Sequence, residues 1–209
     1  MMILVGGLLT ATAVTAGVWY YLTPKYSRVG YQPLQPVAFS HATHVDQLGF
    51  DCRYCHNGVE KSWYSNIPSS TTCMNCHSQV LKDDPRLALV RQSAETGQPI
   101  PWVQIHRVPD YVYFNHSVHV NRGVSCVECH GQVNQMDEVY EVQPLSMTFC
   151  LDCHRNPAAK LRPLDKITDL NWKWSDNPLA NAELQRKNGE KFVHDWHVQS
   201  LQNCSACHR

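Results

Sequence analysis

The chain has 209 residues, and its 18 lysines and arginines balance its 18 aspartates and glutamates, which gives a formal net charge of zero. Such a chain lacks the concentrated positive charge by which proteins bind nucleic acid, so this class of function is excluded. The 12 prolines and 10 glycines fit a fold with many loops.

The first predicted element is an apolar helix at the N-terminus. Residues 3–22 carry no charge, and about 20 such residues are what a helix needs to cross a bilayer. Aromatic residues at 19–21, with Lys25 and Arg28 just beyond, are typical of a membrane interface. The sequence therefore predicts a single-pass transmembrane anchor over residues 1–24.

A cleaved signal peptide and a lipid anchor are the alternatives for this segment. Residues 11–13 offer a small-residue cleavage site, but the basic region that precedes the apolar part of a signal peptide is missing. A lipid anchor needs a spare cysteine, and every cysteine belongs to another motif. We expect the anchor to be retained.

All 10 cysteines belong to five copies of Cys-x-x-Cys-His. In this motif the two thiols form thioethers to one haem, and the histidine binds its iron as the proximal ligand. A zinc site or a disulfide framework would not explain a histidine after every second cysteine. The sequence predicts five covalently bound haem c groups. The motifs are Cys52, Cys55 and His56; Cys73, Cys76 and His77; Cys126, Cys129 and His130; Cys150, Cys153 and His154; Cys204, Cys207 and His208.

Five haems change the expected fold, because porphyrin then supplies much of the apolar core that side chains supply in other domains. We expect a multihaem cytochrome c, loop-rich, with short α-helices packed around five haems and one N-terminal transmembrane helix.

A repeat, Phe-x-His-x-x-His-Val, organises the chain. It occurs at 39–45, 114–120 and 192–198, and its second histidine lies seven or eight positions ahead of a Cys-x-x-Cys-His motif each time. The first two copies lead into two motifs and the third into one. The predicted units are an anchor (1–24), a two-haem module (25–77), a connector (78–113), a two-haem module (114–154), a connector (155–191) and a one-haem half-module (192–209).

Each connector contains a predicted surface helix of about three turns. Both helices begin with an N-cap residue followed by proline, and both are expected to stop at a glycine. These three positions are Asp84, Pro85 and Gly97 in the first helix, and Asn177, Pro178 and Gly189 in the second.

The histidine pairs of the repeat are the candidate distal iron ligands. Histidines three positions apart share one face or one turn, and two so close together rarely bind the same haem. We expect one to serve the following haem and its neighbour to reach a different one. The predicted distal ligands are His41, His44, His116 and His119.

The fifth distal ligand has several candidates. His106, His194 and His197 are the remaining histidines, and Met136 or Met147 would supply a thioether that raises the reduction potential. Seven histidines for five positions mean that no iron has to stay open for a substrate. The composition thus favours a relay of single electrons with no catalytic site of its own.

The anchor, the five motifs and the two segments 102–120 (WVQIHRVPDYVYFNHSVHV) and 144–157 (PLSMTFCLDCHRNP) together resemble the pentahaem cytochrome c subunit of alternative complex III. The resemblance implies a subunit of a quinol:electron-acceptor oxidoreductase in a respiratory or photosynthetic membrane. The implied partners are an iron–sulfur subunit related to molybdopterin enzymes, integral membrane subunits that bind quinol, and a monohaem cytochrome or another soluble acceptor.

Haem is attached to c-type cytochromes on the outer side of the energy-conserving membrane. We therefore expect the haem domain on the periplasmic side of the cytoplasmic membrane. Two other functions stay open at this point. One is a self-sufficient quinol dehydrogenase, and the other is a terminal multihaem reductase, which would contain a high-spin haem.

Overall fold

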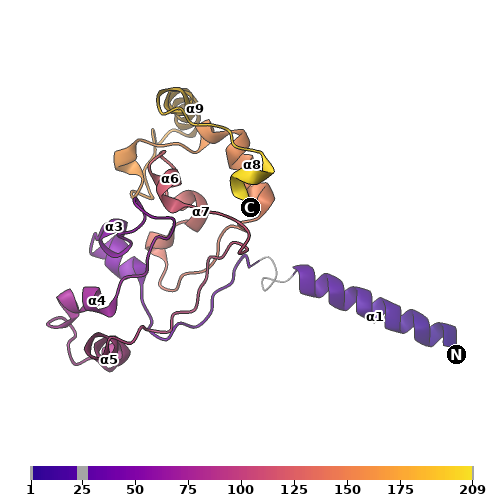
Figure 1. The fold of residues 1–209 in the computed structure, drawn as a ribbon, viewed down its shortest axis with the longest axis horizontal. Coiled ribbons are helices and arrows are strands. Elements are labelled where there is room, and N and C mark those ends of the chain that lie inside the picture. Colours follow the sequence, from indigo (N-terminus) through magenta and orange to yellow (C-terminus); the bar gives the residue numbers. More distant parts are fainter. Residues whose placement is uncertain (1, 23–27, 209) are drawn as a thin grey trace.

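The computed structural model describes residues 2–22 and 28–208. Helices joined by long loops form the fold (Figure 1), and the described residues contain no β-strand, only the isolated bridges Val112–His208 and Val124–Leu161. The expectation of a loop-rich, helical protein is confirmed in this respect. The predicted end of the anchor at residue 24 and Lys25 lie outside the described residues.

Helix α1 (Met2–Leu22) projects away from the body of the protein (Figure 1). The segment Leu4–Leu22 is long and apolar enough to cross a bilayer, although a signal sequence has the same properties. The hydroxyls of Thr10, Thr12 and Thr15 each donate to the carbonyl oxygen four residues earlier, at 2.8–2.9 Å. These bonds satisfy the polar side chains within the helix, as an apolar surrounding requires.

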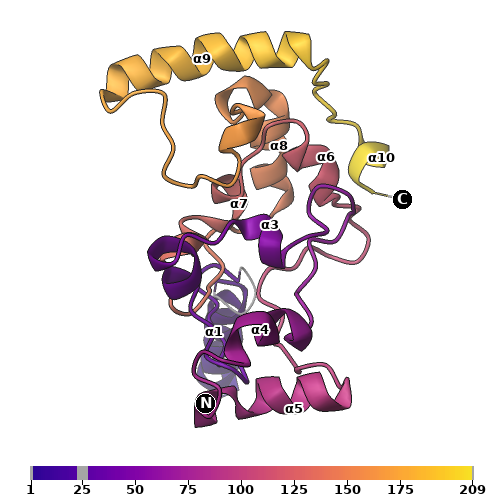
Figure 2. The same ribbon diagram turned by 90° about the vertical axis from the view of Figure 1, so that its left-hand side faces the viewer.

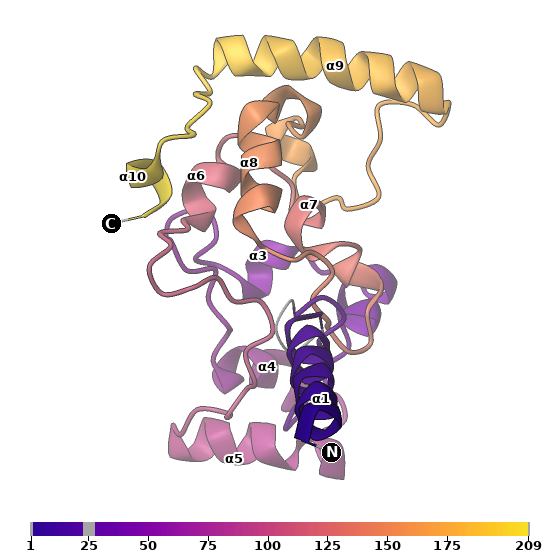
Figure 3. The ribbon, with the colours of Figure 1, turned by 90° about the vertical axis from the view of Figure 1, so that its right-hand side faces the viewer.

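The helices of the body follow one another from one end to the other (Figures 2 and 3). The end opposite α9 is formed by α5 and α4, and α3, α7 and α8 follow in turn, with α6 and α10 beside α8. Their bounds are α3 (Cys52–Cys55), α4 (Ser70–His77), α5 (Ala88–Thr96), α6 (His116–Val120), α7 (Val127–His130), α8 (Met147–Arg155), α9 (Pro178–Asp195) and α10 (Cys204–Cys207). Single turns connect them: η1, a π-helix (Ala42–Gln47), and the 3-10 helices η2 (Pro85–Leu87), η3 (Val133–Gln135), η4 (Pro157–Ala159) and η5 (Leu164–Lys166).

Buried apolar side chains form two small clusters rather than one core. Val90 of α5 packs with Val37 and Ile100 against residues of α4, and a second cluster joins residues of the two halves of the body. The second cluster consists of Val59, Val120 and Ile167. Neither cluster is large enough to hold together a body of this length, so most of the interior must be formed in another way.

The first connector helix forms as predicted. The carboxylate of Asp84 accepts a hydrogen bond from the backbone N–H of Arg86 at 2.8 Å, and Pro85 opens the turn η2 that leads into α5. The helix ends at Gly97, whose φ of 72° is the left-handed conformation that glycine adopts without strain.

The second connector helix begins as predicted and ends elsewhere. The side chain of Asn177 caps α9 by accepting from two backbone N–H groups. The predicted stop at Gly189 is wrong, because α9 continues to Asp195. A Cβ atom at position 189 would overlap the carbonyl oxygen of Ala158. Glycine is therefore needed here for the close approach of α9 to η4, not to end the helix.

Replacing Gly189 by alanine tests this packing. In a free helix the change would stabilise by about 1 kcal/mol, but the added methyl group has no room, so we expect destabilisation by about 1–3 kcal/mol. Thermal unfolding of the detergent-solubilised protein measures the effect, with the exposed Lys187→Ala on the same helix as control. An unchanged or higher melting temperature for Gly189→Ala would contradict the close contact.

Candidate haem-binding site

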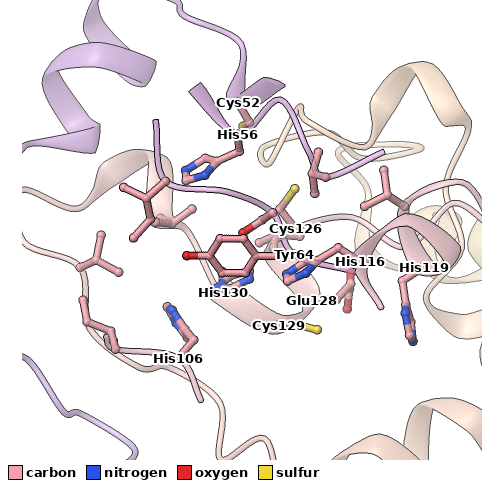
Figure 4. Close-up of a pocket in the computed structure, with 18 of the residues that line it drawn as sticks. Cys52, His56, Tyr64, His106, His116, His119, Cys126, Glu128, Cys129 and His130 are labelled. Carbon is pink, nitrogen blue, oxygen red and sulfur yellow. The ribbon is translucent and has the colours of Figure 1, made fainter. Parts of the chain in front are cut away.

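One cavity of about 2890 Å³ runs through the body of the protein. Pockets for single small molecules usually measure about 300–1,000 Å³, so this cavity has room for several large groups. Every cysteine and proximal histidine of the five motifs except Cys204 lines it. Figure 4 shows the residues of α3 and α7 converging there, with His106 approaching from another segment.

The cysteines lie on or beside short helices, and a side chain caps three of these helices, α3, α8 and α10. Asp51 accepts from the N–H of Arg53 at 2.8 Å at the start of α3, and Asn203 accepts from Ala206 at 2.9 Å at the start of α10. The Asp51 pKa is lowered to about 2, mainly by its bonds to the Arg53 side chain, so this cap stays charged. None of the 10 cysteines is in a disulfide. One helical turn thus presents each pair for attachment to one porphyrin.

Thiols of different motifs are neighbours. The thiols of Cys52 and Cys126 lie close enough for each to affect the pKa of the other. Burial raises the pKa of Cys55, and the neighbouring Cys73 adds to the rise. In this way the motif of α3 lies between those of α4 and α7.

The same relation continues toward the C-terminus. Burial raises the Cys129 pKa to about 12, with Cys153 as the next contributor, and Cys150 has a raised pKa from burial and from Cys207. The five motifs therefore follow each other in space as α4, α3, α7, α8 and α10, and Figures 2 and 3 show the first four of these helices in the same order. In terms of chain order, the second motif comes first in space, and the first, third, fourth and fifth motifs follow it.

Many histidines in the cavity have one ring nitrogen fixed by a backbone carbonyl. A bond from Nδ1–H to a carbonyl leaves Nε2 with its lone pair free for a metal and sets the orientation of the ring. The bonds are His44 to Ser40 (2.8 Å), His56 to Asn66 (2.6 Å), His77 to Val80 (3.0 Å), His116 to Trp63 (2.8 Å), His119 to Asn115 (2.8 Å) and His208 to Tyr111 (3.4 Å).

Three pairs of imidazoles have the separation expected of two ligands on one iron. Metal–nitrogen bonds of about 2 Å place the centroids of two opposed imidazoles about 6–6.5 Å apart. In each pair a histidine of the repeat faces a motif histidine. The centroid distances are 6.2 Å for His44 and His77, 6.5 Å for His116 and His130, and 6.1 Å for His119 and His154.

His41 and His106 are partly buried, and each has one fully buried ring nitrogen. Burial lowers the His41 pKa to about 4, and the nearby His56 adds to the shift. Burial likewise lowers the His106 pKa to about 4. Among the described residues, neither His41 Nδ1 nor His106 Nε2 has a hydrogen-bond partner. Neutral imidazoles with a bare nitrogen fit iron ligation.

These residues match a known family. A family described as "Cytochrome c7 and related cytochrome c" matches residues 37–96 and 112–188, which hold the first four motifs. The chain belongs to this family. Membership in it implies covalently bound haem c, which the cavity and its thiols fit.

Two relatives have similar sequences. The cytochrome is 31% identical over 165 residues to the "Menaquinone reductase, multiheme cytochrome c subunit" of Nitratidesulfovibrio vulgaris, across 69% of this chain and 77% of that protein. It is also 26% identical over 224 residues to a "Cytochrome c-552" of Maridesulfovibrio salexigens, across 82% of this chain and 44% of that protein.

The third copy of the repeat differs from the other two in this cytochrome. Phe39 stacks on His44 and Phe114 stacks on His119, with centroids 4.4 and 4.7 Å apart. In the third copy Phe192 instead stacks on Trp196 at 4.3 Å, near the end of α9. Its first histidine, His194, lies on the exposed surface of α9, whereas His41 and His116 line the cavity.

The candidates for the fifth distal position are separated by the structure. His194 has a side chain 88% exposed, bonds to Asp195 and does not line the cavity. His106, His197 and Met147 do line it. Met136 is buried on another side, against η3. Sequence reasoning had no signal for this separation, because all three repeats read alike.

Two alanine variants test the assignment of distal ligands. His44→Ala removes one ring of a pair, so we expect one haem of the oxidised protein to become high-spin. His194→Ala should leave all haems low-spin because its ring lies outside the cavity. Electron paramagnetic resonance of the ferric protein measures both. The opposite pattern, a high-spin signal in His194→Ala alone, would refute the assignment.

Proposed function

We propose that this cytochrome carries five haems, one per motif, and relays single electrons within a membrane-bound quinol:acceptor oxidoreductase of the alternative complex III type. Haem c, once attached, accepts and donates single electrons. The protein contributes their fixed order, their axial ligands and their shielding from water. No residue in the cavity is assigned a catalytic role.

The ordered contact of the motifs is the observation that carries this proposal. In the series α4, α3, α7, α8 and α10, a thiol of each motif lies near enough to one of the following motif to contribute to a pKa shift there. Cys76 and Cys204 are the two cysteines with exposed side chains, and they belong to the first and last motifs of the series. A continuous series of motifs with an exposed cysteine at each end suits electron entry at one end and exit at the other.

The proposed partners follow from the resemblance of the sequence to alternative complex III. They are an iron–sulfur subunit related to molybdopterin enzymes, integral membrane subunits that bind quinol, and a monohaem cytochrome or other soluble acceptor. Helix α1 would anchor the chain in the cytoplasmic membrane, with the haem domain in the periplasm. The length and apolar composition of Leu4–Leu22 support a membrane location.

The relative with 31% identity gives a reason to consider the opposite direction of electron flow. Its name describes a menaquinone reductase subunit, and the same relay would then carry electrons toward a quinone. A self-sufficient quinol dehydrogenase is the other alternative. It would need a quinol site within this single chain.

Purification from membranes in mild detergent tests the proposal. We expect iron–sulfur and polytopic subunits to accompany the cytochrome, the complex to oxidise a quinol in the presence of an electron acceptor, and the isolated chain to be inactive. Quinol oxidation by the isolated chain would show a self-sufficient dehydrogenase. A complex that only reduces menaquinone would show the reverse direction of flow.

A further inference from the structure

Arg28 connects the point where the chain enters the body to the middle of the haem-binding cavity. Its Nε donates to Glu141 Oε2 at 3.0 Å. Its Nη2 donates to the carbonyl oxygens of Gln104, at 3.1 Å, and Ile105. The two carbonyls immediately precede His106, so one guanidinium fixes the backbone that carries this imidazole.

Glu141 holds Arg28 in turn. Its side chain is 1% exposed, and its backbone pairs in both directions with the segment after Arg28: Gly30 N–H donates to Glu141 O at 2.7 Å, and Glu141 N–H donates to Tyr31 O at 3.1 Å. A buried carboxylate is costly unless it is paired. The planar guanidinium bonds to Glu141 Oε2 and to the two carbonyls at once, which a lysine ammonium cannot do with the same geometry.

His106 is oriented toward the cavity without a partner of its own. Its Nε2 is buried and has no hydrogen bond within the described part of the chain. Its ring lies edge-on to that of His130, with centroids 4.2 Å apart. This distance is too short for two ligands on opposite sides of one iron, which need about 6 Å or more. His106 is therefore available for a haem other than the one that His130 holds.

We infer that Arg28 and Glu141 are positioning residues that hold His106 as an axial iron ligand, so that the entry of the chain from α1 into the body is coupled to the coordination of one haem. The inference rests on haem at these motifs, as proposed above, but not on the identity of the partner complex.

Spin state is the readout, because it reports axial ligation and not folding alone. Replacing His106 by alanine should turn one haem per chain high-spin, and added imidazole should return it to low-spin. Arg28→Lys keeps the charge but cannot make all three guanidinium hydrogen bonds. We therefore expect a high-spin signal at least several-fold above that of the parent protein. Added imidazole should return this haem to low-spin as well. Arg186→Lys, in an exposed ion pair with Glu190 on α9, is the matched control and should resemble the parent.

Electron paramagnetic resonance of the ferric full-length variants, with covalent haem content measured in parallel, decides the matter. His106→Ala with only low-spin haems would overturn the inference. So would parent-like spectra in Arg28→Lys and Glu141→Gln beside a high-spin His106→Ala. Where Arg28→Lys fails to bind its full haem content, Glu141→Gln decides: a high-spin signal rescued by imidazole supports the inference, and a parent-like spectrum overturns it. Failure of the partner complex to form would leave these spectra unchanged.

Discussion

The fold depends on attachment of porphyrin through thioethers to the walls of one cavity. Side chains bury only two small apolar clusters, around Val90 and Val120, whereas the cavity measures about 2890 Å³. Protein interiors are normally close-packed, and a body of this length with such small clusters would not balance the entropy of ordering its long loops. If they bind haem as proposed, the thiols and imidazoles that line the cavity hold the fold together as well.

The two segments predicted as two-haem modules, 25–77 and 114–154, make the same local contacts. In each, a phenylalanine stacks on the second histidine of the repeat, and this histidine faces the proximal histidine of the second motif about 6 Å away. The modules are joined where Cys52 meets Cys126 and where the Nδ1 of His116 bonds to the carbonyl of Trp63. Each of these contacts joins a residue of the first segment to a residue of the second, so the motifs of the two segments form one continuous series.

Local chemistry was predictable from the sequence. The five motifs, the caps Asp84 and Asn177 and the stop at Gly97 depend on neighbouring residues alone, and the structure contains both connector helices. Long-range packing was not predictable. Gly189 reads as a stop, yet it is needed for contact with a residue about 30 positions earlier along the chain.

The candidate site, too, has a part that could be predicted from the sequence and a part that could not. The sequence shows which histidines are available, but the exposure of His194 depends on how far α9 extends, and the third repeat is identical in pattern to the others. Arg28 and Glu141 are 113 positions apart. No local pattern joins them, since their pairing arises only when the segment after α1 lies against residues 138–141.

The central claim is that all five motifs carry covalent haem. Mass spectrometry of the intact, denatured cytochrome tests it most directly, because thioether bonds survive conditions that release non-covalent groups. The expected result is one main species whose mass exceeds that of the polypeptide by five haems. A main species with four haems or fewer, or with none, would contradict the claim.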